Sequence, residues 1–299
     1  MTESAHPVFD YRPPGYMRAA KWAAICAGAV CLACALYVAF WYFMAERLRD
    51  SALVWVDERR GDGFEVGFRQ LDIGGFPWRF DMIIDDVTFA APKSPARWGW
   101  QGERVRASMR PWRLGKVTIE APGSHAFVFA ANGSVRFLQG QALGLNAVLT
   151  FGRHGISPVE VHVADLTLKD AQSGEVWSVD RARLDATRPT GNSETPNAPS
   201  LEVRLRMGDF GVPARLNLPL GPDWERLEIS AGLVGEISDG SAEDALGRWR
   251  DDGGVIQVQR LSLAYGPLSM TAEGTIALDG ALQPVGSLTA RMEGFFETV

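Results

Sequence analysis

The pattern of apolar and polar positions changes once, sharply, along this chain. From Trp22 to Met44 the sequence contains no charged residue and no proline, and helix-compatible residues continue from Ala45 to Arg60 until Gly61-Asp62-Gly63. Beyond Gly61 apolar and polar residues alternate with a period of two, and turn residues punctuate the chain. The pattern therefore predicts a long helical segment followed by an antiparallel β domain.

The clearest alternation covers residues 268–279, and it recurs over residues 201–207 and 288–292. In each segment apolar side chains would occupy one face of a strand and polar side chains the other. These segments predict strands of a sheet that has one polar, solvent-facing side and one apolar side.

The phase of the alternation slips in two places. Apolar positions at 159, 161 and 163 are followed by apolar positions at 166 and 168, and those at 177 and 179 are followed by 182 and 184. A slipped phase predicts a β-bulge or a bent strand, which is typical of curved sheets.

An apolar sheet face can either close a core or line an open groove, and the sequence leaves both possibilities open. A lipid-sized groove would be lined by Leu201, Val203, Leu205, Leu268, Met270, Ile276 and Leu278. The same residues would form the inner face of an ordinary β-sandwich.

The domain organisation follows from these patterns. We expect a mainly β fold of curved antiparallel sheets, open-groove or sandwich-like, with one short helix near Ser241 to Asp252 and a single preceding transmembrane helix. The predicted segments are a cytoplasmic tail (1–21), a transmembrane helix (22–44), a membrane-proximal helix (45–60), a first β half (61–185), a flexible loop (186–200) and a second β half (201–299).

The apolar run is long enough to cross a bilayer, whose hydrocarbon core is about 30 Å thick. Tyr16, Trp22, Trp41 and Tyr42 would place amphipathic rings near the two membrane interfaces. The run is longer than the apolar core of a cleaved signal peptide, so we interpret it as an uncleaved anchor. A short basic segment before it and a long domain after it predict that the N-terminus is cytoplasmic.

Composition narrows the class of protein. The net charge is -6 and Lys and Arg do not cluster, which excludes the phosphate-neutralising surface of a nucleic-acid binder. Cys26, Cys31 and Cys34 all lie in the apolar run, so the domain has no thiol and is compatible with an oxidising compartment.

The sequence offers no pattern that carries catalysis or cofactor binding. His125, His154 and His162 are the histidines beyond the anchor, and they lack the spacing of a zinc site. Asp85-Asp86 and Asp251-Asp252 are adjacent pairs, which in a strand point to opposite faces. We therefore expect no catalytic residue, metal or cofactor.

Two stretches carry a family resemblance. The first is Leu71-Asp72-Ile73-Gly74-Gly75-Phe76-Pro77-Trp78-Arg79-Phe80, and the second runs from Trp249-Arg250-Asp251-Asp252-Gly253-Gly254 to Gln283-Pro284-Val285-Gly286. Both resemble the alphaproteobacterial family called domain of unknown function 2125, which is similar to the AsmA-like envelope proteins. The resemblance implies an anchored periplasmic domain with an apolar inner face, and it implies no catalytic residue. Such a domain is expected to continue beyond Val299, which would suit a truncated gene model.

These observations predict a non-enzymatic protein of the bacterial inner membrane, single-pass, with its C-terminal domain in the periplasm. Its expected partners are the lipid bilayer and either a lipid ligand or an envelope protein. The first hypothesis is a structural or lipid-handling role. The alternative is an adaptor that binds a protein partner through the loop at 186–200 and the tryptophan-rich segment 98–112.

Overall fold

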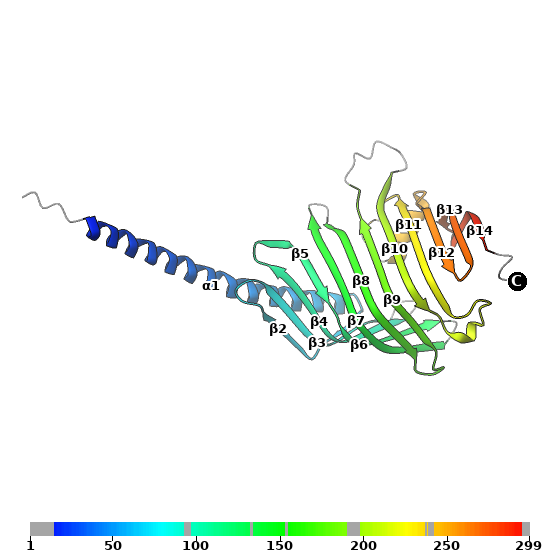
Figure 1. Ribbon diagram of the computed structural model, residues 1–299, viewed down its shortest axis with the longest axis horizontal. Coiled ribbons are helices and arrows are strands. Elements are labelled where there is room, and N and C mark those ends of the chain that lie inside the picture. Colours follow the sequence, from blue (N-terminus) through cyan, green and yellow to red (C-terminus); the bar gives the residue numbers. More distant parts are fainter. Residues whose placement is uncertain are drawn as a thin grey trace, which may run out of the picture. The chain divides into compact units, whose positions relative to one another are not determined.

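The structure, a computed structural model, describes residues 15–92, 97–131, 134–152, 155–189, 198–236, 238 and 242–294. Most of these residues belong to β-strands, as the alternating pattern predicted (Figure 1). In chain order the elements are α1 (Gly15–Gly61), β1 (Glu65–Gly67), β2 (Gln70–Gly74), β3 (Phe80–Ala91), β4 (Trp98–Arg110), β5 (Arg113–Glu120), β6 (Gly123–Ala131), β7 (Ser134–Gly152), β8 (Gly155–Asp170), β9 (Val176–Thr187), β10 (Pro199–Gly211), a 3₁₀ turn (Ala214–Leu216), β11 (Asp223–Val234), α2 (Ala242–Asp251), β12 (Val255–Tyr265), β13 (Leu268–Leu278) and β14 (Pro284–Glu293).

The first helix, α1, is continuous from Gly15 to Gly61, so the predicted transmembrane and membrane-proximal helices are parts of one helix. It is long and apolar enough to cross a membrane, with a mean hydropathy of 2.3 over its most apolar stretch. The helix ends where Gly63 adopts a φ of 91° and its N–H donates to the carbonyl of Arg60. Residues up to Leu48 form one compact unit, and the residues from Arg49 onward form another.

All strands that the structure describes join in a single antiparallel sheet. β1 and β2 both pair with β3, while β5 and β6 each lie between β4 and β7 along different parts of those strands. From β7 onward each strand pairs with the next one in the chain, as far as β14. The sheet is therefore a simple meander, in which hydrogen bonds link neighbours in sequence.

The sheet continues across the predicted boundary between the two β halves. β9 and β10 pair directly, from Ser178 opposite Gly211 to Thr187 opposite Glu202. Strand β9 extends to Thr187 and β10 begins at Pro199, so the connection is shorter at both ends than the predicted loop of residues 186–200. Residues 190–197 of that loop lie outside the described residues.

A line of bent residues crosses the sheet, and we call it the crease. Asp86 in β3, Asp165 in β8 and Asp209 in β10 have φ angles of 52°, 49° and 51°. Asp165 and Asp209 lie opposite the same position of β9, between Val179 and Arg181. In both β8 and β10, the residue before the aspartate pairs with Arg181 and the residue after it pairs with Val179. Gly123, with a φ of 100°, occupies the crease where β5 gives way to β6.

The crease explains the predicted phase slips. Asp165 lies between the apolar positions Val163 and Leu166, and the crease crosses β9 between Val179 and Ala182. Aspartate tolerates the left-handed conformation better than most side chains, because its short polar group can hydrogen-bond locally. The strands pair one to one through these positions, so the change of phase comes from the left-handed backbone at the bend and not from an extra residue in one strand. Trp224 before the crease in β11 stacks on Tyr265 in β12 at a ring distance of 4.3 Å, which fits this continuity.

The second helix, α2, forms where the sequence predicted a short helix. Trp249 is its largest buried side chain, and the indole N–H donates to the carbonyl of Val234 at 2.9 Å. Gly254 follows the helix because a Cβ there would lie 2.3 Å from the Trp249 ring. Ser241, the predicted cap, lies outside the described residues.

The left-handed residues of the crease yield a test of its backbone strain. Replacing Asp165 by Val should lower the free energy of unfolding by about 1–2 kcal/mol, because a β-branched side chain clashes in this conformation. Asp165→Asn should be nearly neutral. Denaturant melts of the full chain in detergent, followed by tryptophan fluorescence, measure both. Equal losses in the two variants would show that the carboxylate, rather than the backbone, matters at this position.

Candidate functional site

One face of the sheet is apolar from the first strand to the last. Directly paired residues of antiparallel strands share a face, so the register defines rows of side chains across the sheet. One complete row consists of Ile73, Met82, Ala107, Ile119, Ala147, Val161, Leu184, Leu205, Ile229, Leu261, Ala272 and Ala290. With neighbouring strands about 4.8 Å apart, the row follows the sheet for roughly 50 Å.

The adjacent row on the opposite face is almost entirely polar. It consists of Asp72, Ile83, Arg106, Glu120, Asn146, His162, Arg183, Arg206, Glu228, Ser262, Thr271 and Arg291. The two faces therefore differ in chemistry over the whole width of the sheet, as in a sheet with one wet side.

The seven residues predicted to line a groove all lie in this one sheet. Leu201, Val203 and Leu205 are in β10, and the other four are in β13. Registers running from β10 through β11 and β12 to β13 connect Leu205 with Ala272 and Leu201 with Ile276. All seven are half-buried, while the intervening Ser269, Thr271 and Thr275 are exposed. The groove residues thus share a face, and they form one end of a much longer apolar surface.

The described strands form one sheet, so the apolar face is not the inner face of a sandwich of two separate sheets. Within the row, ten side chains are half-buried, Ala272 is buried and Ala290 is exposed. At the edge strand β14, Leu288 and Met292 are 49% and 56% exposed. A contiguous apolar surface this large is unusual for a protein surface and marks a site of interaction.

Aromatic rings continue the apolar face on the other side of the crease. Phe89 pairs with Trp100, Trp100 with Phe127 and Phe127 with Leu138. Trp55, near the end of α1, stacks on Phe89 at 6.2 Å, and this part of the helix covers the face locally. The sequence analysis offered the tryptophan-rich segment 98–112 as a protein contact, but it did not detect that Trp100 belongs to an aromatic stripe across neighbouring strands.

His125 is buried in this aromatic stripe, with only 3% of its surface exposed. Its ring lies beside Trp100 and Phe127, and the Trp100 indole N–H donates to Nδ1 at 3.3 Å. Nε2 lies 2.9 Å from the carbonyl of Ala121. Burial lowers the pKa of His125, and the hydrogen bond to Ala121 opposes this only in part. The ring is therefore neutral at neutral pH.

A second buried polar group, Asp170, ends the row that contains Phe127 and Leu138. Its carboxylate accepts hydrogen bonds from the N–H groups of Ser173 and Gln172, and it pairs with Arg136 at 3.1 Å. The N–H of Ser173, then that of Gln172, lowers the pKa of Asp170 most. These contacts hold the turn between β8 and β9, which is a structural role.

The described residues contain no group of three or more His, Cys, Asp or Glu side chains placed to hold a metal ion. His162 pairs with Glu160 at 3.8 Å on the polar face, whereas His154 lies outside the described residues. Asp85 and Asp86 contact Arg104 and Arg69 respectively.

The predicted membrane-interface rings all belong to α1. Trp22 and Tyr42 are 68% and 62% exposed, and Trp41 is 3% exposed with its ring in edge contact with Tyr42. The side chain of Tyr16 is not described. Of the segment 98–112 proposed as a protein contact, Trp98 to Arg110 form β4, and Trp112 lies in the exposed turn that follows.

Comparison with known proteins identifies a family. The family model described as "Uncharacterized protein conserved in bacteria (DUF2125)" matches residues 41–299, which include the last part of α1 and the whole sheet. No curated protein and no solved structure matches the chain.

The buried neutral His125 predicts a pH dependence of stability. Because its pKa is lowered in the folded state, the unfolded chain binds the proton first, and stability is lost as pH falls below about 6.5. In His125→Gln, the free energy of unfolding should change less between pH 7 and pH 5 than in the wild type. Denaturant melts at several pH values measure this.

His162→Gln is the matched control, because that ring is 42% exposed on the polar face. It should retain the wild-type pH dependence. A steeper loss of stability in His125→Gln than in the wild type would contradict the neutral, buried state of His125.

Proposed function

This chain belongs to the bacterial family of uncharacterized proteins DUF2125, and we propose that it is a non-enzymatic, membrane-anchored envelope protein that carries lipid on the apolar face of its sheet. In this proposal α1 crosses the inner membrane once and the sheet lies in the periplasm. The likeness to AsmA-like envelope proteins is part of the same proposal.

The observation that carries the proposal is the unbroken apolar row from Ile73 to Ala290. An ordinary β-sandwich core needs a second sheet, and all the described strands belong to one sheet. An acyl chain is a suitable covering because it is flexible, has no hydrogen-bonding groups and removes apolar surface from water at about 25 cal/mol per Å². A row of roughly 50 Å exceeds the thickness of a bilayer's hydrocarbon core, so it has room for more than one acyl chain.

The chemistry of the opposite face and of the anchor supports the same location. Arginine, aspartate and glutamate on the polar face keep that side in water, so acyl chains would bind on the apolar side only. The basic flank Arg12, Arg18 and Lys21 before the apolar run favours a cytoplasmic N-terminus, and the domain has no cysteine to oxidise.

Paired substitutions on one strand test lipid binding. Met270 lies on the apolar face and the adjacent Thr271 on the polar face. Met270→Asp should stay folded, because water reaches an open face, but it should lose bound lipid by about tenfold, since about 1.4 kcal/mol of unfavourable contact suffices. Native mass spectrometry of the full chain, extracted in a mild detergent, measures lipid per protein.

Thr271→Asp is the control, and it should retain both fold and lipid. Circular dichroism and limited proteolysis report the fold of each variant. Met270→Asp protein that is folded and has unchanged lipid content would overturn the proposal. Wild-type protein that carries no lipid, and that forms one dominant protein adduct on crosslinking in cells, would favour the adaptor instead.

A further inference from the structure

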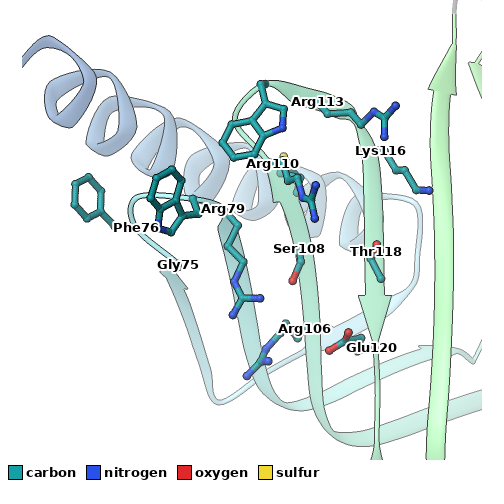
Figure 2. A pocket seen from close by; sticks show the side chains of 13 residues that line it. Gly75, Phe76, Arg79, Arg106, Ser108, Arg110, Arg113, Lys116, Thr118 and Glu120 are labelled. Carbon is teal, nitrogen blue, oxygen red and sulfur yellow. The ribbon is translucent and has the colours of Figure 1, made fainter. Parts of the chain in front are cut away.

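The polar face has a cleft of its own, at the end of the sheet where β2 turns into β3 and β4 into β5. Its volume is about 1010 Å³, and it is lined by residues of the turn Gly75–Arg79 and of the two strands β4 and β5 (Figure 2). The turn is fixed by Gly75, whose φ is 94° and whose carbonyl accepts the N–H groups of Trp78 and Arg79. A Cβ at Gly75 would lie 2.8 Å from the carbonyl oxygen of Arg79, so only glycine fits there.

The lining of this cleft is strongly basic in a chain whose net charge is -6. The lining contains five cations, Arg79, Arg106, Arg110, Arg113 and Lys116, and a single carboxylate, that of Glu120. Arg79 pairs with the buried Asp81 below the cleft, at 2.7 Å. Within the described part of the chain, none of the other four cations lies within ion-pair distance of a carboxylate. Arg106 also keeps its buried Nε without a hydrogen-bond partner there.

Two of these cations are placed where their mutual repulsion lowers the stability of the sheet. Arg110 and Arg113 are directly opposite each other across the β4–β5 hairpin. Like charges at paired positions of a sheet destabilise it. Their placement therefore has no structural explanation, and an anion bound between them would remove the repulsion.

Exposed aromatic rings stand beside the cations. Trp78 is 71% exposed, Trp112 is 63% exposed and Phe76 is 46% exposed. Aromatic rings, tryptophan above all, prefer the boundary between headgroups and hydrocarbon, and basic clusters attract anionic lipids. Binding of a free phosphate would explain the cations, but it would not explain the three exposed aromatic rings.

We propose that this cleft docks the domain on the membrane surface by binding the headgroup of an anionic phospholipid. The cations would contact the phosphate, and the rings of the two turns would enter the interface around it. Gly75 follows soon after the end of α1 at Gly61, so an inserted α1 keeps the cleft at a high local concentration of headgroups. The proposal does not rest on lipid carriage by the apolar face, because the cleft is on the opposite face of the sheet.

Hydrogen–deuterium exchange of the full chain in nanodiscs tests this docking. Amides of residues 75–79 and 110–116 should exchange more slowly in discs that contain phosphatidylglycerol than in discs of phosphatidylcholine alone. The protection should weaken at high salt, because the Debye length falls from about 10 Å at 0.1 M to about 3 Å at 1 M. The double variant Arg110→Gln, Arg113→Gln should lose protection by about fivefold for each cation removed.

The control is the double variant Arg204→Gln, Arg206→Gln, which removes the same charge from exposed positions of β10 outside the cleft. It should retain the protection. The melting temperature of the cleft variant should equal or exceed that of the wild type, since a repulsive pair is removed. Equal protection in both kinds of disc would overturn the proposal. So would the same protection from inorganic phosphate added to phosphatidylcholine discs, because the cleft would then bind a free anion.

Discussion

A β-strand presents successive side chains to opposite faces, and the whole domain depends on this alternation being kept in register across one sheet. Because each strand pairs with its neighbour, a single apolar row runs from Ile73 to Ala290 and a polar row runs beside it on the other face. Each strand of such a sheet forms hydrogen bonds with its neighbours, but the apolar face must still be covered to remove it from water. Part of that cover comes from α1, through the stacking of Trp55 on Phe89.

The crease is what allows such long strands to bend without breaking the alternation. Neighbouring strands pair one to one through the crease, so the change of phase is taken up by a local bend of the backbone and not by an inserted residue. Three aspartates fill left-handed positions there, at Asp86, Asp165 and Asp209, and Arg69 and Arg181 pair with two of them. Backbone geometry therefore explains some acidic residues that could be taken for an active site in the sequence. Asp86 of the adjacent pair Asp85-Asp86 is an example, because it occupies a left-handed position.

Local patterns predicted much of this fold, whereas long-range register could not be predicted. Alternation over residues 268–279 gave the correct face for Met270 and Thr271, and the slip between Val163 and Leu166 located the crease. The short helix predicted near Ser241 to Asp252 corresponds to α2, Ala242–Asp251. However, the seven groove residues predicted from two strands cover only one end of the apolar face, because joining them to Ile73 or Val161 requires knowing which residues pair. The partners of His125 could not be found for the same reason, since Trp100 reaches it across β4 and β6.

The basic cleft was not predicted, and it shows how the two faces can have separate tasks. Four of its five cations, Arg106, Arg110, Arg113 and Lys116, lie in one β-hairpin segment that contains no acidic residue, so the sequence held a local signal that was overlooked. Only Arg79 joins them from another turn, through strand pairing. A net charge of -6 conceals such a patch, since acidic residues elsewhere outweigh it. Like charges at paired positions destabilise a sheet, and in the proposed docking a bound anion would relieve this repulsion. Acyl chains would then bind on the apolar face of the sheet, and charged headgroups would bind on the polar face.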